Sequence, residues 1–149
     1  PDQNLILLDG STIYNSSHLF GFFSIFNSTS VDDITLIKGG MPAKYGGRLS
    51  SVLEINQSSG SKTDWNVKGS IGTISSKISF GGPIIKNKMS FLFSARRTYI
   101  DILLAPIIPK SSSFSGSSYF FYDLNLKFDY QINKKNSIAL SGYYGIDKF

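Results

Sequence analysis

Apolar and polar residues alternate without a break from Tyr122 to Asn133. A period of two places one kind of side chain on each face of a β-strand. This segment therefore predicts a strand that lies between an apolar environment and a wet one. The apolar positions are Tyr122, Leu124, Leu126, Phe128, Tyr130 and Ile132.

The same period recurs in the preceding and following segments, and the whole region after residue 63 predicts antiparallel, up-and-down strands. The parity of the apolar positions changes near Gly72, which indicates a turn between two strands there. Five strands are predicted, at residues 64–72, 74–83, 88–101, 119–132 and 137–147.

The connections between these strands differ in length. Pro83 to Lys88 and Asn133 to Asn136 are short and fall at the same end of the sheet, whereas Ala105 to Ser118 is long and falls at the other end. Short turns on one side and long loops on the other are typical of outer-membrane β-barrels, with the short turns periplasmic. A soluble β-sandwich or meander with one solvated face also alternates, so this second interpretation remains open.

Residues 1–60 have a different pattern, with short apolar runs separated by glycines. We expect a small mixed α/β lobe here, in which Met41 to Tyr45 forms one helical turn. The Phe-rich segment from His18 to Phe26 is compatible with a helix or a loop. The polar linker Gln57 to Thr63 separates this lobe from the strands of residues 61–149. Strands are predicted at Asn4–Leu8, Val31–Ile37 and Ser51–Asn56.

Composition excludes several classes of protein. The 149 residues include no Cys, so neither disulfides nor thiolate metal sites are available. Basic residues exceed acidic ones by 5, but they are scattered, so no nucleic-acid partner is expected. His18 is the one histidine, and no nucleophile elbow accompanies it. We therefore expect no catalytic residues, no metal site, no cofactor and no enzymatic activity.

Residues 31–56 read VDDITLIKGGMPAKYGGRLSSVLEIN. This segment resembles the closing part of the plug domain in TonB-dependent outer-membrane receptors. Upstream, residues 7–14 (LLDGSTIY) resemble the family's strand and turn, and residues 17–21 (SHLFG) resemble a subgroup common in Bacteroidota. Downstream, residues 81–93 resemble an early barrel hairpin. The resemblance covers about residues 3–100 and rests on the order and spacing of these motifs.

The resemblance implies a fold and a set of motif residues. It assigns residues 1–60 to the C-terminal part of a plug and residues 61–149 to about the first five strands of a transmembrane barrel. Gly40 replaces the usual Pro, and Lys38 stands where Arg is commoner. Lys38 and Arg48 would lock the plug to carboxylates of the barrel, although Lys lacks the bidentate fork of Arg. The motif residues are Lys38, Gly39, Gly40, Tyr45, Gly46, Gly47 and Arg48.

The resemblance also implies active uptake of a scarce nutrient, such as an iron chelate, a glycan or a peptide, across the outer membrane of a Gram-negative bacterium. Implied partners are outer-membrane lipid, the nutrient, a surface lipoprotein, and the TonB complex through a segment expected upstream of Pro1. We expect the chain to be a piece of a longer barrel protein. Alternatives are a plugged barrel that transduces signals or serves a surface or secretion complex, and a soluble β-rich binding module. Candidates for ligand contact are His18, Phe20, Phe22, Arg96 and Arg97.

Overall fold

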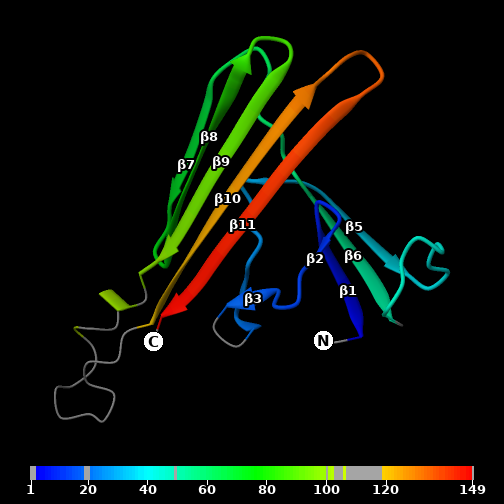
Figure 1. Cartoon of the computed structure of the whole chain (residues 1–149). Coiled ribbons are helices and arrows are strands. Elements are labelled where there is room, and N and C mark those ends of the chain that lie inside the picture. The colour runs from blue at the N-terminus through cyan, green and yellow to red at the C-terminus, as the bar shows by residue number, and fades with distance from the viewer. Residues whose placement is uncertain are drawn as a thin grey trace.

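The computed structural model describes residues 3–18, 21–48, 50–99, 101–102, 106 and 119–148. Its strands form three sheets (Figure 1): β11-β10-β9-β8-β7, β2-β1-β6-β5 and β3-β4. The first 57 residues hold β1 (Asn4–Leu8), β2 (Ser11–Thr12), β3 (Ser17–His18), β4 (Phe23–Ser24), β5 (Val31–Lys38) and β6 (Ser51–Gln57). The remaining strands are β7 (Asn66–Ile71), β8 (Ser75–Ile85), β9 (Met89–Thr98), β10 (Phe120–Gln131) and β11 (Ser137–Lys148).

The five-stranded sheet confirms the antiparallel, up-and-down order predicted for residues 64–147, and each strand lies within a few residues of its predicted bounds. The turns β8–β9 and β10–β11 lie at one end, and the long connection from β9 to β10 starts and finishes at the other (Figure 1). The turn predicted near Gly72 is present, because Ile71 pairs with Ser76. This third short turn lies at the same end as the long connection.

The lobe formed by residues 3–57 is built on strands rather than on helices. Strand β1 pairs in parallel with β6, and β6 pairs antiparallel with β5. Its small core consists of Leu5, Leu7 and Val52, against which Ile37, Met41 and Tyr45 pack.

No α-helix is found among the described residues of this lobe. The segment Met41 to Tyr45 forms a turn closed by a 3.0 Å hydrogen bond from the Tyr45 amide to the Pro42 carbonyl. Gly39 and Gly40 before it and Gly47 after it have positive φ and bend the chain sharply instead of continuing it as a helix. The Phe-rich segment after Ser17 contains the short β3–β4 hairpin.

The two faces of the five-stranded sheet differ in chemistry. The register places Leu124 beside Ala95 and Tyr144 on one face, and Asp123 beside Arg96 and Gly145 on the other. We call the first the outer face and the second the inner face. Outer-face side chains include Val67, Ile78, Phe80, Phe91, Phe93, Leu124, Leu126, Phe128, Leu140 and Tyr144; inner-face side chains include Lys68, Lys77, Ser79, Ser90, Ser94, Arg96, Asp123, Asn125, Lys127, Tyr143 and Asp147.

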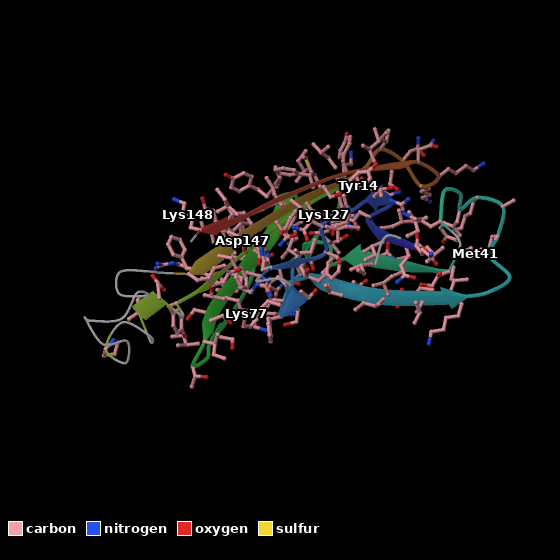
Figure 2. The ribbon with its side chains drawn as sticks, turned by 90° about the horizontal axis from the view of Figure 1, so that it is seen from below. Tyr14, Met41, Lys77, Lys127, Asp147 and Lys148 are labelled. Carbon is pink, nitrogen blue, oxygen red and sulfur yellow. The ribbon has the colours of Figure 1, made fainter. Side chains whose placement is uncertain are left out.

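The lobe covers the polar inner face over β8, β9 and β10 and leaves the apolar outer face open (Figure 2), while the inner-face residues of β7 are exposed. Asp123 is completely buried, whereas its neighbour Leu124 remains 37% exposed and Leu140 67% exposed. This is the reverse of a soluble sheet, in which apolar side chains face the protein core. Among the described residues, no helix is long and apolar enough to span a membrane.

Candidate functional site at the interface between the lobe and the sheet

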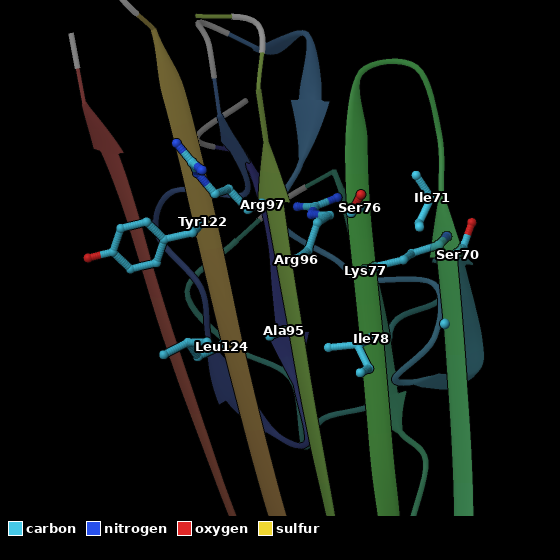
Figure 3. Close-up of a pocket in the computed structure, with 11 residues that line it drawn as sticks. Ser70, Ile71, Ser76, Lys77, Ile78, Ala95, Arg96, Arg97, Tyr122 and Leu124 are labelled. Atoms are coloured by element: carbon cyan, nitrogen blue, oxygen red, sulfur yellow. The ribbon is translucent and has the colours of Figure 1, made fainter. Parts of the chain in front are cut away.

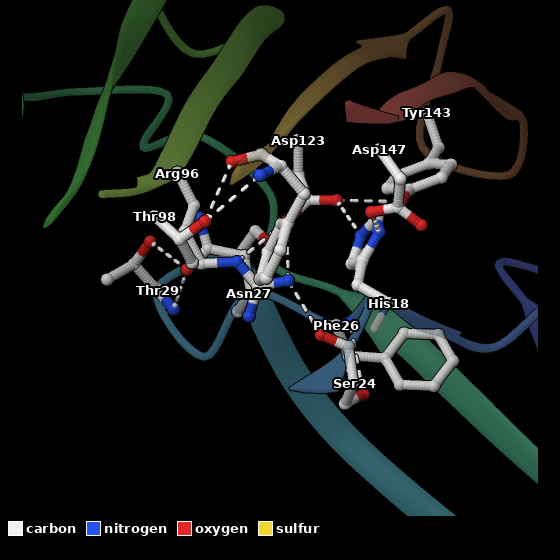
Figure 4. Close-up of polar contacts among 12 residues, drawn as sticks. His18, Ser24, Phe26, Asn27, Thr29, Arg96, Thr98, Asp123, Tyr143 and Asp147 are labelled. Carbon is white, nitrogen blue, oxygen red and sulfur yellow. Dashed lines mark hydrogen bonds and ion pairs between the residues drawn. The ribbon is translucent and has the colours of Figure 1, made fainter. Parts of the chain in front are cut away.

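His18 connects the lobe to two adjacent strands of the five-stranded sheet (Figure 4). Its Nε2 lies 2.6 Å from Oδ1 of Asp123 on β10, and its Nδ1 lies 2.7 Å from Oδ1 of Asp147 on β11. The imidazole also stacks on Phe121, with ring centroids 4.1 Å apart and an interplanar angle of 9°. Through its two ring nitrogens, His18 thus contacts carboxylates on both strands.

Asp123 is the centre of this cluster. Besides His18, it accepts hydrogen bonds from Arg96 Nε at 2.7 Å and from the Tyr143 hydroxyl at 2.7 Å. Arg96 also donates through Nη2 to the carbonyl oxygen of Ser24, at 2.6 Å, and thereby reaches the lobe. A fully buried carboxylate is tolerated because its charge is paired and its oxygens are hydrogen-bonded.

A second polar contact lies farther along β10. Lys127 Nζ is 3.1 Å from Oδ1 of Asp9 and 2.7 Å from the carbonyl oxygen of Gln57. The same Asp9 oxygen accepts a hydrogen bond from the backbone N–H of Gln57, at 2.9 Å. Asp9 has φ of +47° in the turn after β1, a conformation that Asp adopts more readily than most residues. The turn therefore directs a carboxylate at the inner face of the sheet.

The two-residue period of β10 places the residues of both contacts on the same face of the sheet. Asp123 and Lys127 are four residues apart, so both side chains point to the inner face. Asn125 lies between them and is buried, as is Ser94 beside it on β9. The lobe is thus attached to the sheet through charges and hydrogen bonds.

Several buried polar atoms of this interface have no hydrogen-bond partner among the described residues. They belong to both sides of the interface: Asp9 Oδ2 and Gln57 Nε2 from the lobe, and Ser90 Oγ, Ser94 Oγ, Asn125 Nδ2 and Asp129 Oδ2 from the sheet.

The residues predicted to contact a ligand lie in different places. His18 and Arg96 belong to the buried cluster around Asp123. Phe22 is 82% exposed on the lobe. Arg97 points to the outer face, and Phe20 lies outside the described residues.

The predicted motif residues from Lys38 to Arg48 gather at the end of the lobe beyond β5. Lys38 is exposed, and Arg48 donates to the neighbouring carbonyl of Gly47 at 3.2 Å. Tyr45 stabilises the lobe, because its hydroxyl donates a hydrogen bond to Glu54 Oε2 at 2.8 Å and its ring packs on the core. Neither cation bonds to the five-stranded sheet among the described residues, so their locking role stays a prediction.

Sequence reasoning did not single out Asp123, Asp147, Lys127 or Asp9 as attachment residues. The sequence did indicate the face on which the β10 residues lie, because Asp123 and Lys127 stand at odd positions together with the other polar residues of that strand. The partners could not be assigned, since they lie 105 to 129 residues away along the chain.

Comparisons with known proteins add no assignment. No protein-family model matches the chain, and searches of curated proteins and of solved structures found no match.

Proposed function

We propose that this chain is part of a TonB-dependent outer-membrane transporter. In this proposal, residues 61–149 supply about five strands of the transmembrane barrel wall and residues 1–60 belong to the plug inside it. The observation that carries the proposal is the orientation of the five-stranded sheet, whose apolar face is open and whose polar face is covered by the lobe over β8, β9 and β10.

The exposed apolar side chains on the outer face support a lipid environment. They come from four of the five strands, β7, β8, β10 and β11, and include Val67, Ile71, Ile78, Phe80, Leu124, Leu126, Ile138, Leu140 and Tyr144. Soluble monomers rarely leave so continuous an apolar surface open. In a membrane barrel, lipid covers such a surface, and the inward face is polar.

The size of the apolar band fits an outer membrane. Tyr122 and Ile132 are ten residues apart, which corresponds to about 33 Å of strand at about 3.3 Å per residue. At a strand tilt of about 40° this length spans about 25 Å, the height of the apolar band in outer-membrane barrels. Aromatic side chains stand at both ends of the outer face, with Tyr122 and Tyr144 at one and Trp65 at the other, as in the aromatic girdles of such proteins.

The lobe fits the part of a plug. It lies against the inner face and forms its own sheets instead of joining the barrel strands. Its attachment through His18 and Asp9 is polar, which suits an element that must hold the barrel closed and yet be displaced for transport. The resemblance of residues 31–56 to the plug motif supports the same assignment.

The proposal requires further strands, because an open sheet edge cannot be left in lipid. In the proposed transporter, TonB would act on the plug, and a nutrient would enter from the side of the long connection. The alternative of a soluble β-rich module is disfavoured by the open apolar face.

Fractionation of the complete protein in a Gram-negative host tests the proposal. We expect it in the outer membrane, released only by detergent, and we expect its loss and loss of TonB to impair growth on the same limiting nutrient. Recovery of the folded protein in the soluble fraction would overturn the barrel assignment. Membrane recovery with a nutrient phenotype that does not depend on TonB would overturn the transport mechanism alone.

A further inference from the structure

The outer face carries a groove of about 850 Å³ that runs over β9 (Figure 3). Its floor is Ala95, which pairs with Ile78 on one side and with Leu124 on the other. A methyl group between two larger side chains leaves a depression, and Gly69 extends the low surface beyond Ile78. The groove is apolar along most of its length.

Charge is confined to one end of this groove. Arg97 lies two residues beyond Ala95 on the same face, and its side chain is 52% exposed. Its guanidinium stacks 4.9 Å from the ring centroid of Phe120, and Lys148 Nζ lies 5.9 Å from the same centroid. Arg97 and Lys148 are the only charged outer-face residues in the described strands β7 to β11.

The position of the two cations matches a membrane interface. Tyr122 and Tyr144 flank them, with ring centroids 6.2 Å apart, at the end of the sheet where the long connection begins. Aromatic rings at strand ends mark the level of lipid head groups in outer-membrane barrels. Among the residues that the structure describes, Arg97 forms one ion pair, with Asp101 at 3.6 Å, which is longer than a hydrogen bond.

We propose that this groove binds a membrane lipid with a phosphate head group. The inference rests on the proposed location in a membrane. One acyl chain lies over Ala95 between Ile78 and Leu124, and the phosphate meets Arg97 and Lys148. The guanidinium fork suits bidentate contact with phosphate oxygens, and the ammonium adds a second positive charge.

A matched pair of lipids separates the contribution of the phosphate from that of the acyl chains. The complete protein in neutral detergent is offered equal amounts of dioleoylphosphatidic acid and dioleoylglycerol, and bound lipids are measured by native mass spectrometry. We expect a preference for the phosphorylated lipid of about thirtyfold, since two cations near a lipid surface contribute about 1 kcal/mol each. The double substitution Arg97→Gln and Lys148→Gln should remove the preference, whereas Lys134→Gln with Lys135→Gln at the opposite end should preserve it. Ala95→Leu should lower retention of both lipids.

The outcomes are distinguishable. An unchanged preference in the Arg97→Gln and Lys148→Gln protein would overturn the lipid site. Displacement of the lipid by excess inorganic phosphate would indicate a free-anion site, and a lipid-free dimer would indicate that a second copy covers this face; either result would also overturn it. A membrane-integrated protein without lipid preference would refute this inference alone, whereas a soluble protein would refute the proposed function itself.

Discussion

Lys127 and Asp9 are 118 residues apart in the chain, yet their Nζ and Oδ1 atoms lie 3.1 Å apart at the interface between the lobe and the sheet. Both side chains are nearly buried. Removing one member of such a pair leaves an uncompensated charge in a poorly solvated place. The Lys127–Asp9 pair therefore helps to hold the lobe against the sheet.

A double-mutant cycle tests that contact. We expect Lys127→Met and Asp9→Asn each to weaken the protection of the Gln57 amide against hydrogen exchange in the complete protein. The two effects should be non-additive, with a coupling energy of about 1–3 kcal/mol. Lys134→Met, in the exposed turn after β10, is the matched control and should change nothing. Additive effects would mean that Lys127 and Asp9 act independently.

The cluster around Asp123 predicts a larger effect. Asp123→Asn removes the charge that faces His18 and Arg96 while keeping the size of the side chain. We expect the β3–β4 hairpin to open more easily by about 3 kcal/mol, because the Arg96 guanidinium, which also binds Ser24 of β4, loses its buried anionic partner. The opening of the hairpin is measured by hydrogen exchange at the backbone amide of Phe23.

Asp32→Asn is the control for this substitution, since Asp32 lies exposed on β5. Equal exchange rates in the Asp123 and Asp32 variants would show that the cluster does not hold the hairpin.

Trp65 offers a local probe of the outer face. It is the one tryptophan of the chain, and a Cβ atom placed on Gly82 would lie 2.7 Å from its ring. Gly82→Ala should therefore move the indole away from Phe91, whose ring centroid is 5.8 Å distant, and shift the fluorescence emission. Because Trp65 is exposed and can move, we expect the free energy of unfolding to change by less than about 1 kcal/mol. Gly142→Ala, where nothing lies within 4 Å, should leave the emission unchanged; an equal shift in both variants would contradict the close approach.

The strands were predictable because their signal is local. The alternation from Tyr122 to Asn133 and the change of parity near Gly72 reflect only the two-residue period of a strand. The attachment of the lobe was not predictable, because His18 meets carboxylates more than a hundred residues away. The direction in which the apolar face points also depends on where the lobe packs, so alternation alone left a soluble sheet and a membrane barrel as alternatives.

In the proposed barrel, β10 presents its even positions to lipid and its odd positions to the lobe. The chain has no Cys, so single cysteines can be placed at Leu124, Leu126 and Phe128 and, as controls, at Asn125 and Asp129. Spin labels on the reconstituted complete protein are then tested for collisions with lipid-soluble oxygen and with a water-soluble nickel chelate. We predict high oxygen accessibility at the three even positions and low oxygen accessibility at the two odd ones. Even positions that are open to the nickel chelate, or shielded from both reagents, would contradict the membrane-facing orientation of this sheet.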